Sequence, residues 1–163
     1  MLKKVISGGQ TGIDQIGLKT AKMAKLKTGG TATKGYRTEN GPRYQLKHLY
    51  GLIESWDWLY PTRTEQNVLD SNGTVIFGST DETGTKLTVK LLKKHKKPYI
   101  INPDNSDVLI KFIKENNIEI LNVAGNRGSK LTPFQRSHTG LLLLLTFKHF
   151  ETNIKDNDTT INE

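Results

Sequence analysis

The stretch from residue 6 to residue 15, Ile-Ser-Gly-Gly-Gln-Thr-Gly-Ile-Asp-Gln, constrains the fold of this chain more than any other. The apolar pair Val5-Ile6 leads into three glycines within five positions, and apolar residues then recur at helical spacing from Ile13 to Ala24. This order predicts a strand, a tight glycine turn and a helix. Glycine lets a ligand approach the backbone closely, and a helix N-terminus attracts anions. A purely structural corner would use the same glycines, so both interpretations stay open.

The same order of strand, polar loop and helix recurs further along the chain. Residues 74–77 predict a buried strand, and a loop rich in glycine and threonine follows at 78–85, before a helix. A last clear strand, 118–125, leads into a third polar loop at 126–130. Strands that alternate with helices in this way predict an α/β fold with a mainly parallel sheet.

Parallel sheets bind ligands beyond the carboxyl ends of their strands, and the segments 7–15, 78–85 and 124–130 all lie at such ends. We therefore predict that these three loops form one site for a phosphate or another anion. Backbone amides of the glycine loops would hold the anion, and Arg127 with Lys34 or Arg37 would neutralise it. The predicted ligand-binding residues are Gly8, Gly9, Gln10, Thr11, Gly12, Asp14, Lys34, Tyr36, Arg37, Gly84, Thr85, Gly125, Asn126, Arg127 and Ser129.

Two of these predictions have structural alternatives. Asp14 can complement the dipole of the first helix, or it can face a cation or the polar end of a ligand. The segment 34–42 can be an exposed loop, or its Tyr, Arg, Lys and Glu side chains can bind a nucleotide-like ligand. Apolar residues from Leu46 to Trp56 predict a core-facing helix over 44–56. Residues 63–67 are expected between this helix and the next strand, with Arg63 and Glu65 paired.

Length and composition limit the remaining possibilities. The 163 residues predict one domain over 1–150 and a polar, flexible tail over 151–163. The absence of cysteine and the scattered four histidines give no support to a metal site. The N-terminal apolar run is too short for a signal peptide, and the leucines at 141–145 are too few for a membrane span. We expect a cytoplasmic protein that does not bind membranes.

The net charge of +8 includes six lysines within residues 86–97, where no acidic residue occurs. A solvated helix face explains these lysines, and single-stranded nucleic acid is the alternative partner. Aromatic residues do not alternate with the lysines as they do on a base-stacking surface, so we do not favour nucleic acid.

Five motifs in this order resemble a known family. They are Ser7–Asp14, Thr33–Glu39, Arg63–Val68, Asp70–Phe77 and Asn122–Ser129. The chain resembles, over about residues 5–130, the candidate molybdenum-carrier proteins, also described as circularly permuted YpsA-like members of the SLOG superfamily. From Leu131 onward it departs from the family pattern.

The resemblance implies a Rossmann-like three-layer fold, homo-oligomers and a nucleotide or nucleotide-derived ligand, with a molybdopterin-like pterin as one candidate. The family is related to the lysine-decarboxylase-like proteins and to the Lonely Guy phosphoribohydrolases. Nothing in the sequence independently indicates a metal or a pterin.

The hydrolase relatives carry a G-G-x-G-T-x-x-E motif with a catalytic glutamate, and Thr88 stands where that glutamate would be. We therefore predict a binding or carrier protein rather than an enzyme. The alternative is a hydrolase of nucleotide N-glycosidic bonds in which Glu82, Glu39 or Asp14 replaces the missing acid.

Overall fold

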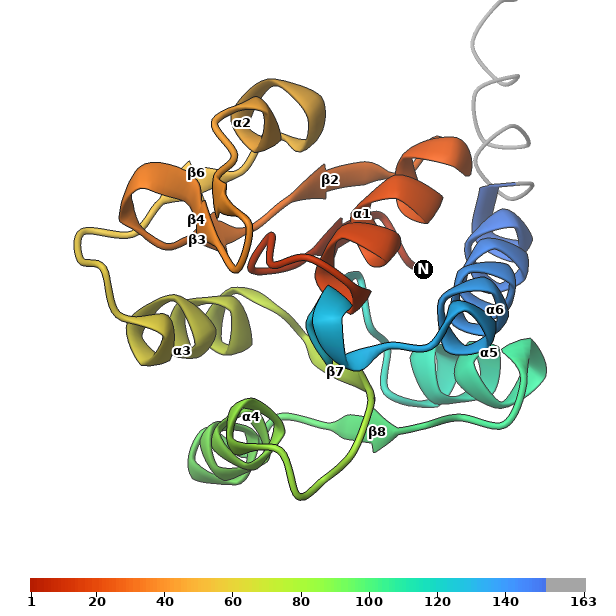
Figure 1. Cartoon of the computed structure of the whole chain (residues 1–163). Coiled ribbons are helices and arrows are strands. Elements are labelled where there is room, and N and C mark those ends of the chain that lie inside the picture. The colour runs from red at the N-terminus through yellow and green to blue at the C-terminus, as the bar shows by residue number, and fades with distance from the viewer. Residues whose placement is uncertain (152–163) are drawn as a thin grey trace, which may run out of the picture.

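The structure is a computed structural model that describes residues 1–151, so the predicted tail lies outside the described residues except for Glu151, which ends the last helix. Five parallel strands form the central sheet in the order β2-β1-β9-β7-β8 (Figure 1). These strands are β1 (Lys4–Ile6), β2 (Lys27–Gly29), β7 (Gly73–Phe77), β8 (Tyr99–Ile101) and β9 (Ile120–Gly125). The predicted α/β class with a parallel, Rossmann-like sheet is confirmed.

Helices cover both faces of this sheet (Figure 1). On one face lie α1 (Ile13–Met23), α5 (Ser106–Glu115) and α6 (Pro133–Glu151), and on the other lie α3 (Tyr60–Asp70) and α4 (Thr83–Lys94). The last strand, β9, is inserted between β1 and β7 and pairs in parallel with both. The carboxyl ends of β1, β9 and β7 are therefore neighbours, and the three polar loops that follow them start at one edge of the sheet.

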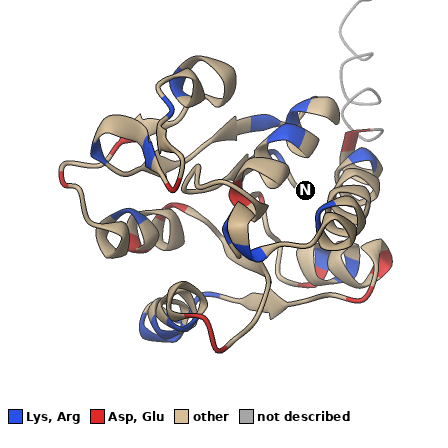
Figure 2. Cartoon of the chain, in the orientation of Figure 1, with Lys and Arg blue, Asp and Glu red and all other residues tan. Residues whose placement is uncertain are grey.

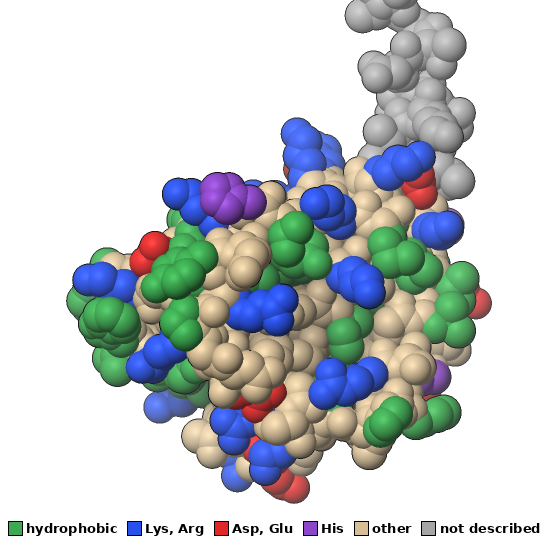
Figure 3. Space-filling view, turned by 45° about the horizontal axis from the view of Figure 1, so that its top comes forward, with side chains coloured by type: hydrophobic (Ala, Val, Ile, Leu, Met, Phe, Trp, Pro, Cys, Tyr) green, Lys and Arg blue, Asp and Glu red, His purple; other side chains and the backbone are tan. Residues whose placement is uncertain are grey.

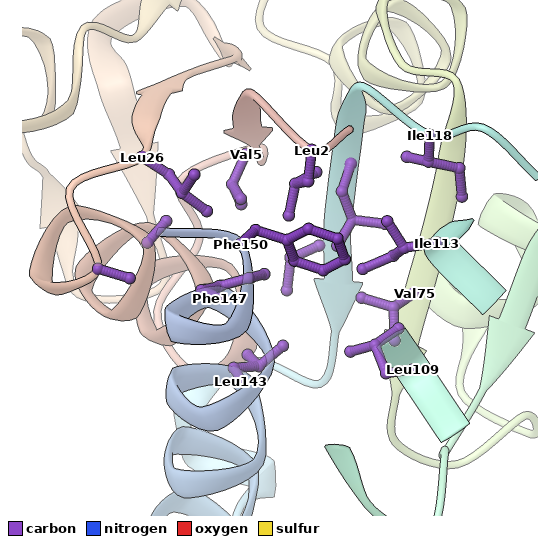
Figure 4. Close-up of a cluster of buried hydrophobic side chains, with 14 of the residues drawn as sticks. Leu2, Val5, Leu26, Val75, Leu109, Ile113, Ile118, Leu143, Phe147 and Phe150 are labelled. Carbon is purple, nitrogen blue, oxygen red and sulfur yellow. The ribbon is translucent and has the colours of Figure 1, made fainter. Parts of the chain in front are cut away.

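The main hydrophobic core lies between the sheet and the layer of α1, α5 and α6 (Figure 4). Val5 and Val75 of the strands meet Leu109 of α5 and Phe147 of α6, and each of these side chains is fully buried. The outer side of α6 is also apolar, because Leu141 and Leu145 remain about half exposed. This helix therefore anchors the chain through one face and leaves leucines on the other.

Smaller elements extend the molecule beyond β2. They are β3 (Thr31–Ala32), the 3-10 helix η1 (Lys34–Tyr36), β4 (Arg37–Thr38), β5 (Gly41–Pro42), α2 (Gln45–Tyr50) and β6 (Ile53–Glu54). A second 3-10 helix, η2 (Gly128–Lys130), follows β9. Within residues 1–151, no helix has the length and apolar character needed to cross a membrane.

In the segment between β3 and β7, one predicted helix was too long and another helix was not predicted. The helix predicted over 44–56 ends at Tyr50, because Gly51 adopts a left-handed conformation with φ of 70°. Ile53 and Trp56, the last apolar residues of the predicted helix, are 63% and 81% exposed and do not face the core. Residues 63–67, which were expected between that helix and the next strand, lie within α3, for which no helix was predicted. Pro61 in the first turn of α3 is a typical helix-start signal.

Candidate functional site

A cavity of about 390 Å³ opens at the carboxyl edge of the sheet, between the glycine loop that precedes α1 and the helices α3 and α4. Eight of the predicted binding residues line it: Gly8, Gln10, Asp14, Gly84, Thr85, Gly125, Asn126 and Arg127. Two helices begin at this cavity, α1 and α4, and their N-terminal ends differ in what occupies them.

The N-terminal end of α1 is occupied by the protein's own carboxylate. Asp14 lies in the first turn of α1, is 4% exposed, and accepts a hydrogen bond from the Gln10 amide at 3.1 Å. The Gly8 amide is a further donor to this carboxylate. Burial raises the pKa of the Asp14 carboxyl above its usual value, while Arg63 and the amide donors act in the opposite direction.

Three further amides of this segment also donate to groups of the protein. The Gly9 amide donates to Ser7 Oγ at 3.2 Å, and the Thr11 amide donates to Gln10 Oε1 at 3.0 Å. The Ile13 amide donates to the carbonyl of Asn126 at 3.1 Å. The loop therefore does not offer these amides to a ligand, although its glycines led us to predict that it would.

Arg63 of α3 completes this end of the cavity. Its Nη1 lies 3.2 Å from Asp14 Oδ2, and both side chains are largely buried. The guanidinium occupies the space that a Cβ at position 8 would need, which explains why Gly8 has no side chain. Arg63 Nε is buried without a partner among the described residues. The predicted Arg63–Glu65 pair was wrong, because Glu65 instead accepts from Lys94 Nζ at 2.7 Å and lies 2.7 Å from His95 Nε2.

The N-terminal end of α4 is open. Glu82 precedes the helix without a side-chain capping bond, and no residue in 1–151 accepts from the amides of Thr83, Gly84 or Thr85. A Cβ at Gly84 would meet no atom within 4 Å. The Thr88 hydroxyl donates to the Gly84 carbonyl at 2.9 Å, one turn further along. Three unpaired amides at a helix N-terminus are suited to an anion.

A second carboxylate joins the other two predicted loops. Glu39 accepts from Ser129 Oγ at 2.5 Å, from the Ser129 amide at 2.9 Å and from the hydroxyl of Thr11. Arg127 Nε lies 3.6 Å from the same carboxylate. The Ser129 and Thr11 hydroxyls are the main causes that lower the pKa of Glu39 to about 2. This end of loop 126–130 therefore binds an anion that the protein itself supplies.

The other predicted binding residues do not line the cavity. Gly9, Thr11, Gly12, Lys34, Tyr36, Arg37 and Ser129 lie outside its lining. The Tyr36 ring is buried and its hydroxyl donates to the Leu52 carbonyl at 3.1 Å. Lys34 lies over the ring of Trp58, and Arg37 lies over that of Tyr60. A Cβ at Gly9 would meet Leu52, which belongs to a small hydrophobic cluster with Leu18, Ala32, Tyr36 and Leu46.

Several polar residues of the cavity were not predicted, among them Tyr60, Arg63, Asn67 and Lys130. The first three lie on α3, a helix that was not predicted. Placing a helix after Pro61 would have put Arg63 and Asn67 on one face, since they are four residues apart.

Positive charge is distributed over several elements rather than gathered at the cavity. Lysines cluster on α4, and acidic residues lie in the loop before it (Figure 2). On the face shown in Figure 3, lysine and arginine side chains are spread singly among other residues. At the cavity itself, Arg127 is about half exposed, and Lys130 Nζ lies 3.9 Å from Glu82. Both cations line the cavity together with the first turn of α4.

Comparisons with known proteins agree with the fold and with the motifs. The model of the circularly permutated YpsA SLOG family matches residues 5–145, so it extends beyond Leu131, where we had placed a departure from the family. A crystal structure of a candidate molybdenum carrier protein from Syntrophus aciditrophicus superposes with a TM-score of 0.78. It is 33% identical over 90% of this chain and 94% of that chain. Curated proteins give no significant match.

Proposed function

This chain belongs to the circularly permutated YpsA SLOG family, and we propose that it is a binding or carrier protein for a phosphorylated, nucleotide-like small molecule. The observation that carries this proposal is the open N-terminus of α4 in the cavity, where the amides of Thr83, Gly84 and Thr85 have no partner within residues 1–151. Such amides bind phosphate because they combine donors with the positive end of the helix dipole.

The rest of the cavity suits the remainder of such a ligand. Ile76 and Leu87 contribute apolar side chains, and Asn122 and Asn126 contribute amides. A volume of about 390 Å³ falls in the usual range for small-molecule sites. Arg127 and Lys130 would offset the charge of the phosphate, with Arg127 able to bind it bidentately.

Molybdenum, if it is the cargo, would be recognised through hydrogen bonds rather than through coordination. The chain has no cysteine, and residues 1–151 hold no group of three or more His, Asp or Glu side chains that could bind a metal ion. The unpaired amides of α4 instead suit a tetrahedral oxyanion or the phosphate of a pterin. The family membership and the relative from Syntrophus aciditrophicus support a carrier role on this basis. The implied homo-oligomer stays a prediction, which light scattering in solution tests.

The alternative is a hydrolase that cleaves the N-glycosidic bond of a nucleotide. Two carboxylates, Asp14 and Glu82, line the cavity and give this alternative its acid candidates. Glu39 is not among the lining residues, and its carboxylate is held by Ser129 and Thr11. Release of free base from nucleoside monophosphates at ordinary enzyme rates, about 1–1000 per second, would overturn the carrier proposal. Loss of this turnover in Glu82→Gln would identify the acid.

The experiment that tests the proposal identifies the ligand and its place. Mass spectrometry of the protein as purified should detect a phosphorylated small molecule. Thermal melting with nucleotides, dinucleotides, pterin phosphates and molybdate should then find at least one stabiliser. At 100 times its dissociation constant, a ligand adds about 2.7 kcal/mol, which raises Tm by roughly 5–10 °C.

Gly84→Leu is the variant that locates the site. Because a side chain at position 84 starts in open space, it should block the anion without disturbing the fold. The ligand-induced shift should disappear while the unliganded Tm stays the same or rises, since glycine disfavours helix. Gly140→Ala, a glycine of α6 outside the cavity lining, is the control and should keep the full shift. An unchanged shift in Gly84→Leu would contradict the proposal.

A further inference from the structure

Asp14 places a carboxylate in the wall of the candidate cavity. Its carboxylate accepts from the amides of Gly8 and Gln10, which belong to the glycine loop at the N-terminus of α1. These are the donors that such a loop usually offers to a phosphate group. Asp14 also lines the cavity that contains the open N-terminus of α4. One cavity therefore has one free anion position and one that a fixed carboxylate fills.

The contacts around Asp14 hold this carboxylate in place. Ser7 Oγ donates to the backbone carbonyl of Asp14 at 3.1 Å and accepts from the Gly9 amide at 3.2 Å. Arg63 approaches Asp14 to 3.2 Å and spreads over Gly8. The Arg63 guanidinium also lies 5.5 Å from the ring centre of Tyr60. The carboxylate is thus part of the cavity wall and has its own cation.

A ligand with a second phosphate would meet two obstacles at this end. The amides of Gly9, Thr11 and Ile13 already donate to protein groups, so the phosphate would find few donors. It would also have to compete with the Asp14 carboxylate for Arg63, the cation at this end of the cavity. A ligand that carries a single phosphate or another single oxyanion avoids both obstacles.

We propose that Asp14 is a specificity-determining residue that restricts the cavity to ligands with a single oxyanionic group. This inference rests on the proposed function, since it assumes that the first oxyanion binds at the N-terminus of α4. It excludes dinucleotides and nucleoside di- and triphosphates as preferred ligands. Within the class of phosphorylated small molecules, it favours those with one terminal phosphate.

Calorimetric titration of the full chain with AMP, ADP, GMP and GDP tests this inference. The wild type should bind the monophosphate of at least one base roughly tenfold more tightly than its diphosphate. Asp14→Asn keeps the size of the side chain but removes the charge. The ratio of the diphosphate dissociation constant to the monophosphate dissociation constant should therefore fall towards one or below it. Asp70→Asn changes the net charge equally at an exposed position of α3 and should keep the wild-type preference.

The outcomes separate this inference from the proposed function. If the wild type binds ADP or GDP as tightly as the monophosphate, the inference about Asp14 is wrong while the binding function stands. If Asp14→Asn folds and keeps the full preference, Asp14 is likewise not the determinant. If neither monophosphate binds and the thermal panel contains no stabiliser, the proposed function itself fails. The wild-type comparison decides the inference even if Asp14→Asn does not fold.

Discussion

The N-terminal ends of α1 and α4 face the same cavity, follow glycine-containing loops, and differ in one respect. At α1 the Asp14 carboxylate accepts from the amides of Gly8 and Gln10, and the first helical amide, that of Ile13, donates to the Asn126 carbonyl. At α4 the amides of Thr83, Gly84 and Thr85 have no acceptor within residues 1–151. The loop with more glycines is therefore the one that is filled. A glycine-rich turn at a helix N-terminus shows that an anion is favoured there, but it does not show whether the anion is a ligand or a side chain.

The largest expected effect is on the free energy of unfolding and concerns the N-terminal end of α1, where Asp14 pairs with Arg63. Arg63→Ala should lower the free energy of unfolding by about 3–5 kcal/mol, because it leaves the buried Asp14 carboxylate without its cation. Urea denaturation followed by circular dichroism measures this change. Arg43→Ala alters an exposed arginine and is the control, with an expected loss of at most about 0.5 kcal/mol. A loss below 1 kcal/mol in Arg63→Ala would mean that the Asp14–Arg63 pair does not stabilise the N-terminal end of α1 as a buried ion pair.

A smaller effect on the free energy of unfolding is expected at Glu39, whose carboxylate joins the loop of Thr11 to the loop of Ser129. Glu39→Gln removes charge-assisted bonds from Ser129 and Thr11 and should cost about 1–3 kcal/mol at neutral pH. Because the folded state lowers the pKa of Glu39 from 4.5 to about 2, its contribution is complete above pH 4.5. This contribution is lost as the pH falls towards 2.

Denaturation curves between pH 6 and pH 2 check this prediction. The stability difference between the wild type and Glu39→Gln should shrink steadily below pH 4.5. Glu115→Gln, which alters an exposed pair with Lys111, should give no such pH dependence. A difference that stays constant over this range would show that Glu39 is not bound as an anion between the loops.

Arg127→Ala separates ligand binding from folding. The Arg127 side chain is 53% exposed, so its loss should change the unliganded stability by less than about 1 kcal/mol. The ligand-induced Tm shift should nevertheless fall, since the arginine would no longer offset the charge of the phosphate. Thermal melts with and without the best stabiliser measure both quantities. If Arg127→Ala unfolds the protein and the remaining ligand response is intact, Arg127 is a structural residue.

The smallest effect is expected from the lysines at the other end of α4. Lys93→Gln should leave the ligand-induced Tm shift unchanged, because the anion position depends on the first turn of the helix. Two neighbouring lysines already have partners within the protein. Lys94 pairs with Glu65, and Lys97 donates to the carbonyls of Leu69 and Ser71. Fluorescence anisotropy with single-stranded DNA should show only weak binding at physiological salt. Sub-micromolar binding that Lys93→Gln weakens would instead favour the nucleic-acid alternative.

The sequence predicted the sheet well because its strands carry local signals. The strand–loop–helix order around β1, β7 and β9 depends on short apolar runs and glycine, and these patterns are visible without tertiary information. Helix α3 was not predicted, because the polar residues 62–66 lack an apolar stripe and the signal from Pro61 was not used. The helix predicted for α2 was too long, because the apolar spacing continues past Gly51 although the backbone there turns left-handed.

The candidate site could be predicted only in part. The edge of the sheet and the segments that meet there follow from topology, and eight predicted residues line the cavity. Which amides are free could not be predicted, since it depends on where Asp14 and Glu39 place their carboxylates. Asp14 is four residues from Gln10, but Glu39 reaches Ser129 across 90 positions. Contacts of that range are not encoded in local sequence patterns.

The most direct test of the difference between α1 and α4 is an NMR titration of the ¹⁵N-labelled full chain with inorganic phosphate. The largest changes in amide chemical shift should occur at Thr83, Gly84 and Thr85. The amides from Gly9 to Thr11 should change little, because they keep their protein acceptors. Largest changes at Gly8–Gly12, with α4 unaffected, would contradict the account and would return the anion site to the glycine loop of α1.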